Sequence, residues 1–293
     1  MFNEISKLAI VKQSRKGKVR DIYDLGETLL IVSTDRISAF DVVFPTLIPD
    51  KGKILNAISV YFFQATSDII PNHFISANIS EYPVELQSFG KYLDGCSMLV
   101  KKTRVIPFEC IVRGYLSGSA WKEYKKSNTI GGMLIAEEMQ ESQKFPHPLF
   151  TPSTKAESGH DENISYREFM SRMDESLAVY IKDKALELYS YAHNVLLKKG
   201  VILADTKFEF GTIGSEVLLI DELFTPDSSR FWSLEDYEIG KSPKSYDKQF
   251  IRDYLENSGW DKQSSPPPLP EEVIEQTRQK YLTILKIITG KEL

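Results

Sequence analysis

Cysteine is nearly absent from this 293-residue sequence, which contains only Cys96 and Cys110. Two thiols are too few for the disulfide framework of a small secreted protein or for a thiolate metal site. The sequence also lacks a signal peptide and an apolar run long enough to cross a membrane. We therefore expect a cytoplasmic protein with no membrane partner, whose two thiols are packed in strands.

A strong excess of charge is also missing, because the formal net charge is only −5 and no basic block stands out. An electrostatic grip on a nucleic-acid backbone is therefore excluded as the main activity, and any bound anion should be small. Hydrophobic residues make up 42% of the chain, which is enough for a large core. The length favours two lobes.

Strand and helix patterns are mixed along the chain without regular βαβ alternation, which favours an α+β fold. The clearest helix is predicted over 177–195, where apolar residues recur at three- and four-residue spacing. Residues 131–161 are rich in polar residues and proline and predict a long loop. The remaining predicted strands are 29–33, 98–106, 108–116, 201–210 and 216–224, and the remaining predicted helices are 54–67, 121–126, 247–257 and 271–288.

The hairpin predicted over 201–224 carries charged residues where a core face would carry apolar ones. Asp205, Lys207 and Glu209 alternate, so a strand places all three on one face. Asp221 and Glu222 on the second strand point to opposite faces, and a one-residue change of register exchanges them. Such carboxylates suit magnesium, with a lysine beside a phosphoryl group. The alternative is the polar outer face of an exposed hairpin.

Three further segments have the composition of anion sites. Residues 15–21 join four cations to a glycine, which lets backbone amides approach phosphate. Residues 113–119 place an arginine, two glycines and two serines before a helix, and 225–230 end a turn with an arginine. A solvated turn for the first segment, and a helix cap with Ser119 as N-cap for the second, are the alternatives.

Four segments taken together resemble the signatures of the SAICAR synthetase family, in order and at suitable separation. They are GKVRDIY (17–23), PFECIVRG (107–114), LADTKFEFG (203–211) and DELFTPDSSR (221–230). Residues 33–41 and 245–250 resemble the longer form of this family. The resemblance covers roughly residues 15 to 260.

The resemblance implies a two-lobed α+β fold related to ATP-grasp enzymes, with nucleotide between a β-rich lobe over 1–114 and an α+β lobe over 115–293. It also implies a ligase of purine biosynthesis that joins the carboxylate of carboxyaminoimidazole ribotide (CAIR) to the amine of L-aspartate. ATP and Mg²⁺ would be required, and an acyl phosphate would be the intermediate. A monomer is expected.

The resemblance also assigns roles to residues of this chain. It places the ATP phosphates on Gly17, Lys18, Val19 and Arg20, with the connection from Lys101 to Glu109 beside the adenine. It makes Glu209 and Asp221 the magnesium ligands and puts Lys207 on the transferred phosphoryl group. It implies that substrate is held by Arg36, Asp41, Arg113, Ser119, Lys155, His160, Asp161 and Arg230, with Asp227 steadying Arg230.

Two rival functions share part of this pattern. A kinase also needs metal carboxylates and a phosphate loop, but the HRD and DFG signatures are absent from the sequence. A nucleotide-binding module without turnover would have no need to keep Lys207, Glu209 and Asp221 together.

Overall fold

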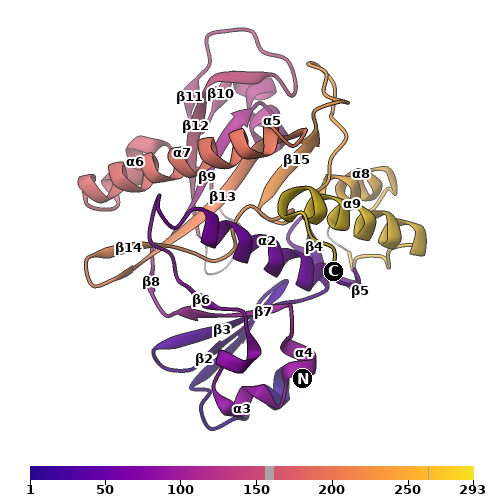
Figure 1. Ribbon diagram of the computed structural model, residues 1–293. Helices are drawn as coiled ribbons and strands as arrows, with labels where there is room; N and C mark the ends of the chain where they lie inside the picture. Colours follow the sequence, from indigo (N-terminus) through magenta and orange to yellow (C-terminus); the bar gives the residue numbers. More distant parts are fainter. Residues whose placement is uncertain (156–161, 263) are drawn as a thin grey trace.

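Two antiparallel sheets organise the chain in the computed structural model, which describes residues 1–155, 162–262 and 264–293 (Figure 1). The smaller sheet lies in the N-terminal part of the chain, and the larger sheet is assembled from segments between residues 104 and 233. Helix α2 (Lys51–Ala65) lies between them (Figure 1). The expected two-lobed α+β fold is confirmed.

The smaller sheet has the order β1 (Gln13–Lys16), β2 (Arg20–Asp24), β3 (Thr28–Ser33), β7 (Ser97–Lys101), β6 (Phe74–Ser76). Its faces follow from strand alternation along β3. Leu30 and Val32 pack into an outer cluster with α1 (Phe2–Ile5), α3 (Val84–Gln87) and α4 (Gly90–Leu93), whereas Ile31 joins the main core with α2. Both faces are therefore covered.

The larger sheet has the order β12 (Lys144–Thr154), β9 (Phe108–Tyr115), β13 (Val201–Ile213), β14 (Glu216–Ile220). Strands β8 (Arg104–Val105) and β15 (Ser229–Ser233) also pair with β13. Helix α7 (Glu175–Leu197) packs on this sheet. The shorter helix α6 (Tyr166–Ser171) precedes it in the sequence. The boundary expected at residue 114 falls inside β9, and the chain passes between the sheets at residues 102 and 103.

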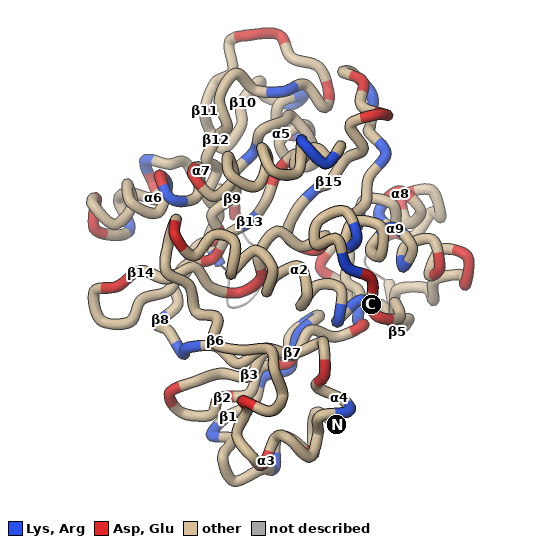
Figure 2. Tube along the Cα trace, viewed as in Figure 1, with Lys and Arg blue, Asp and Glu red and all other residues tan. Residues whose placement is uncertain are grey.

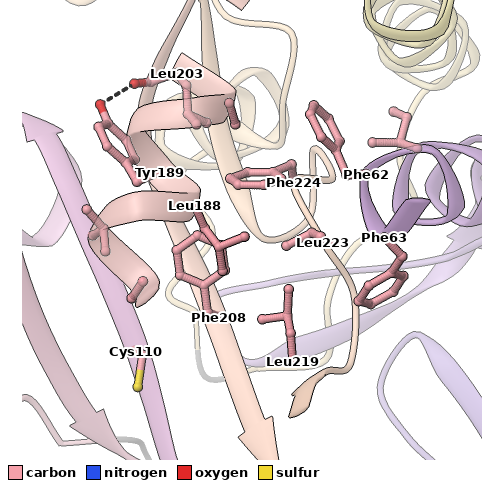
Figure 3. Close-up of a cluster of buried hydrophobic side chains, with 14 of the residues drawn as sticks. Phe62, Phe63, Cys110, Leu188, Tyr189, Leu203, Phe208, Leu219, Leu223 and Phe224 are labelled. Carbon is pink, nitrogen blue, oxygen red and sulfur yellow. Dashed lines mark hydrogen bonds between the residues drawn. The ribbon is translucent and has the colours of Figure 1, made fainter. Parts of the chain in front are cut away.

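The main core is continuous between the two sheets. Figure 3 shows Phe62 of α2 directed at Phe224, and Phe208 of β13 beside Leu188 of α7. The Phe62 and Phe224 ring centroids are 4.7 Å apart, and the Phe208 and Phe224 centroids are 5.3 Å apart. Because side chains from α2, β13 and α7 share one buried cluster, the lobes are packed together and are not merely tethered.

The predicted long loop over 131–161 was wrong in part. The segment contains β11 (Met133–Leu134), which pairs with the preceding β10 (Thr129–Ile130), and the long strand β12. Pro146, Pro148 and Pro152 hid the strand, since proline cannot donate to a ladder. They are tolerated because β12 is an edge strand that pairs with β9 alone among the named strands of its sheet.

The C-terminal helices pack against a hairpin from the N-terminal part of the chain. This hairpin is β4 (Arg36–Ala39) and β5 (Val42–Leu47), and its Ile37 and Phe44 share a cluster with Ile251 of α8 (Gln249–Asn257) and Val273 of α9 (Glu271–Thr289). Helix α5 (Gly118–Ser127) follows β9 directly. Residues distant in sequence thereby come together beside α5 and α8.

Charged residues of both signs are distributed over both lobes (Figure 2). This pattern agrees with the absence of a basic block in the sequence. In the described part of the chain, no helix has the length and apolarity that a membrane crossing requires.

Candidate active site

The two lobes meet at an ion pair between Arg20 of β2 and Asp221, which follows β14. Both nitrogens of the guanidinium fork engage both carboxylate oxygens, with Nη2 and Oδ2 2.8 Å apart. Glu222 lies 3.5 Å from Nη2 of the same arginine. This pair joins the predicted phosphate loop to the predicted metal ligand across 201 residues of sequence.

Asp221 lies just outside the strand ladder, in a conformation that few non-glycine residues adopt. The ladder between β13 and β14 pairs Glu209 with Ile220, and Asp221 follows with φ of 74°. Strand alternation therefore ends at Ile220, and the question of register between Asp221 and Glu222 does not apply. Residues held in such a conformation are concentrated at functional sites.

Lys207 is the centre of a second part of this cluster. Its Nζ donates to Glu109 at 2.7 Å and to Glu209 at 2.9 Å. Glu209 also accepts from Lys155, which follows β12. The predicted common face of Lys207 and Glu209 is therefore present, and strand β9 adds Glu109 to it.

The neighbours of Asp221 and Lys207 hold both groups in their charged forms. Burial opposes ionisation of Asp221, but Arg20 and Lys207 outweigh it and hold the pKa of Asp221 below its usual range. Burial also opposes the cation of Lys207, yet Glu209 and Glu109 raise the pKa of Lys207 well above its ordinary value. The cluster is thus a compact set of acidic and basic side chains, which suits phosphate and a divalent cation.

The carboxylates present fit magnesium. Among the described residues, no group of three or more histidine, cysteine, aspartate and glutamate side chains is arranged as a closed metal cage. Magnesium is usually held by one or two carboxylates together with waters and substrate phosphates. Glu209 and Asp221 offer such a donor set, and Arg20, Lys207 and Lys155 now occupy their oxygens.

The predicted phosphate loop connects β1 to β2 as a tight turn. The amide of Gly17 donates to the carbonyl of Arg20 at 2.7 Å, and a Cβ at position 17 would lie 2.9 Å from that oxygen. Lys18 and Asp41 form an exposed ion pair of 2.7 Å. Lys101 is exposed at the end of β7. Asp41 therefore lies beside the loop.

A second charged cluster surrounds Asp205, two residues before Lys207 on the same strand. Its Oδ2 accepts from Arg230 at 2.5 Å and from Arg113 at 3.4 Å. Arg113 also donates to Ser119 at 3.2 Å. Two of the three predicted substrate arginines, Arg113 of β9 and Arg230 of β15, are thus brought together.

This second cluster opens into a cavity of about 370 Å³. Its walls combine cations of α5 and α8 and several serine hydroxyls with Arg230, and they also carry the carboxylates of Glu141, Asp253 and Glu256. Sequence reasoning missed most of them, because cations on surface helices carry no local signal of a site. The lining side chains outside the predicted set include Phe40, Lys122, Lys125, Trp232, Gln249 and Arg252.

Asp227 does not steady Arg230 as expected, since Asp205 does so. Asp227 instead accepts from Lys51 at 2.8 Å, from Lys248 at 2.9 Å and from the Tyr281 hydroxyl at 3.1 Å. Burial opposes its ionisation, but Lys248 and Lys51 hold the pKa of Asp227 below its usual range. It therefore ties the 225–230 turn to α2, to Lys248 just before α8, and to α9.

The remaining predicted substrate residues lie elsewhere. Lys155 forms an ion pair with Glu209. Arg36 lies beside the phosphate loop, and its guanidinium forms an ion pair with Asp21. His160 and Asp161 lie outside the described residues.

The fold and these clusters define a two-lobed α+β protein with two neighbouring clusters of charged side chains along strand β13. The SAICAR synthetase family model matches residues 13–267. The phosphoribosylaminoimidazole-succinocarboxamide synthases of Thermodesulfovibrio yellowstonii and Geotalea uraniireducens are 53% and 51% identical to the chain, covering 96% of it and 96% and 95% of themselves. The chain belongs to the SAICAR synthetase family, as the resemblance predicted.

A solved structure supports the same conclusion. The SAICAR synthase of Saccharomyces cerevisiae, solved in complex with SAICAR, is 41% identical, with a TM-score of 0.88 over 97% of each chain.

Proposed function

We propose that this chain is an ATP-dependent ligase that joins CAIR and L-aspartate to give SAICAR, ADP and phosphate in purine biosynthesis. Family membership over nearly the whole chain supports this activity. The observation that carries the site assignment is the single face of β13 that bears Asp205, Lys207 and Glu209. Two-residue steps along a strand are roughly 7 Å, so the anion cluster and the phosphoryl cluster are neighbours. We further propose that the reaction takes place in the cytoplasm and that the enzyme is a monomer.

The chemistry explains why ATP is needed. A carboxylate is a poor acyl donor, because oxide would have to leave when the amine attacks. Transfer of the terminal phosphoryl group to the CAIR carboxylate gives an acyl phosphate, and attack by the neutral aspartate amine then releases phosphate. Lys207 lies where it can neutralise the transferred group, so its contribution is positioning and charge compensation.

Glu209 and Asp221 would hold Mg²⁺, which supplies charge neutralisation on the nucleotide phosphates when bound. The nucleotide phosphates would lie between Lys207 and residues 17–20, because Arg20 already contacts Asp221. The connection from Lys101 to Glu109 would border the adenine. The bound phosphates would then replace the carboxylates as partners of Arg20 and Lys207. The cation would replace these two residues as the partner of the carboxylates.

The cavity beside Asp205 is the proposed place for the CAIR phosphate. Ser119 and Arg230 line this cavity, and the buried Arg113 donates to the Ser119 hydroxyl. Asp205 holds both guanidinium groups in place and neutralises one of them. The acyl group would then extend along β13 towards Lys207.

A coupled ADP-release assay tests the function. We expect ADP release only when CAIR, L-aspartate, ATP and Mg²⁺ are all present, and omission of CAIR should abolish it. Steady ADP release with neither CAIR nor aspartate would contradict the ligase, and a phosphorylated hydroxyl product would point to the rival kinase. Binding of ATP without any turnover would favour the nucleotide-binding module.

Gly118→Ala should weaken CAIR binding roughly 10-fold, by displacing Arg230 and its charge-assisted hydrogen bonds. A Cβ at position 118 would lie 2.2 Å from Arg230 Nη2. Gly214→Ala is the matched control, because Gly214 has nearly the same φ, 59° against 57°, but nothing within 4 Å of a new Cβ. Both variants carry the same backbone strain. Equal KM values for CAIR in the two variants would contradict the role of Arg230.

A further inference from the structure

The carbonyl groups of Gly17, Lys18 and Val19 in the phosphate loop all accept hydrogen bonds from Thr34 or Arg36. Arg36 donates from Nη2 to the carbonyl of Gly17 at 3.1 Å and from Nε to that of Lys18 at 3.0 Å. Thr34 donates to the carbonyl of Val19, from its amide at 3.1 Å and from its hydroxyl at 2.7 Å. Three consecutive carbonyls thus accept from Arg36, the first residue of β4, and from Thr34, two residues before it.

This pattern decides which backbone groups remain for a ligand. A carbonyl oxygen repels phosphate, whereas an amide attracts it. Within the described residues, no backbone hydrogen bond uses the amides of Lys18 and Val19. With the carbonyls held by Arg36 and Thr34, these amides are the groups that the loop can offer to an anion.

Arg36 is itself held by contacts at each of its three guanidinium nitrogens. Its Nη2 donates to Asp21 Oδ1 at 2.6 Å, and its Nη1 lies 3.5 Å from Oδ2 of the same carboxylate. Asp21 is only 2% exposed. All three guanidinium nitrogens therefore contact groups of the chain itself, and the partner carboxylate, that of Asp21, is buried.

We infer that Arg36 is a positioning residue, which shapes the 17–20 loop for the ATP phosphates through the backbone and does not bind substrate. This inference rests on the proposed function and replaces the expected substrate role of Arg36. The planar fork is essential to it, because lysine is a point charge and cannot hold two carbonyls and a carboxylate in fixed directions.

Three variants test the inference through different atoms. Arg36→Lys keeps the charge but loses the fork, Asp21→Asn loosens the arginine, and Thr34→Val releases one bond to Val19. We expect each to raise the Kd for MgATP roughly 5- to 10-fold, since each loosens donors to the phosphates. The Kd for CAIR should stay unchanged. Isothermal titration calorimetry of each ligand alone separates these effects.

Arg278→Lys is the matched control, because Arg278 of α9 also donates two guanidinium nitrogens to one carboxylate, but that carboxylate belongs to Asp50 and not to Asp21. It should leave both Kd values at those of the wild type.

Several outcomes would overturn the inference. A higher Kd for CAIR with unchanged ATP binding in Arg36→Lys would make Arg36 a substrate ligand. An effect on ATP in Arg36→Lys alone, with Asp21→Asn and Thr34→Val unchanged, would indicate direct contact with nucleotide. Equal loss of both ligands together with a lower Tm would indicate a general structural role. If the wild type bound neither ligand, the proposed function itself would fail.

Discussion

Asp221→Asn is expected to lower kcat by about 10²- to 10³-fold, the range seen when one group that stabilises transition-state charge is removed. Asparagine keeps the shape of the side chain and tolerates the left-handed conformation that position 221 has, with φ of 74°. It removes the negative charge that a divalent cation requires. The fold should survive, so Tm should stay within a few degrees of the wild-type value.

Glu222→Gln is the informative comparison for this prediction. Glu222 also contacts Arg20, at 3.5 Å, and accepts from the Thr225 hydroxyl at 2.6 Å, so it is the other carboxylate that the sequence left open. If Asp221 is the metal ligand, only Asp221→Asn should raise the Mg²⁺ concentration needed for half-maximal rate. A larger effect in Glu222→Gln would transfer the metal role to that residue.

Local periodicity accounts for the parts of the fold that the sequence predicted well. The helix predicted over 177–195 corresponds to α7, which spans Glu175–Leu197, because its apolar face repeats through six turns. The hairpin around residue 214 and its charged face were likewise confirmed by β13 and β14. Both patterns depend only on neighbours within a few residues, so they can be read without knowing the fold.

Contacts between distant segments account for what the sequence did not predict. Asp227 is held by Lys51, 176 residues earlier, and by Lys248, and nothing near Asp227 in sequence signals this pairing. The strand β12 was hidden by its prolines, which only an edge position permits. The left-handed turn at Asp221 is decided by the end of the β14 ladder, which depends on its partner strand.

The sequence predicted which residues belong to the candidate site better than it predicted which of them contact one another. Lys207, Glu209, Asp221, Arg113 and Arg230 were named from motifs, and the structure brings them into two clusters on one sheet. The cations of α5 and α8 that complete the cavity were missed. Their function depends on the packing of α8 and α9 against the β4–β5 hairpin, which is a property of the whole fold.

Arg230→Ala is expected to raise the KM for CAIR roughly 10- to 100-fold while changing kcat much less. The guanidinium supplies charge-assisted hydrogen bonds, each of about 1.5–3 kcal/mol, and every 1.4 kcal/mol is about a tenfold change in affinity. Such a loss affects ground state and transition state alike when the contact is remote from the reacting carboxylate. Steady-state kinetics with CAIR varied at saturating ATP and aspartate measures it.

The fold should tolerate this change, because Asp205 keeps Arg113 and the Ser117 hydroxyl, each at 3.4 Å, after Arg230 is removed. Arg230→Lys should fall between wild type and Arg230→Ala, since it retains the charge but not the fork. Arg172→Ala, on an exposed arginine paired with Glu168, should leave the KM for CAIR unchanged. A KM for CAIR that stays at the wild-type value in Arg230→Ala, with normal Tm, would place the CAIR phosphate outside the cavity beside Asp205.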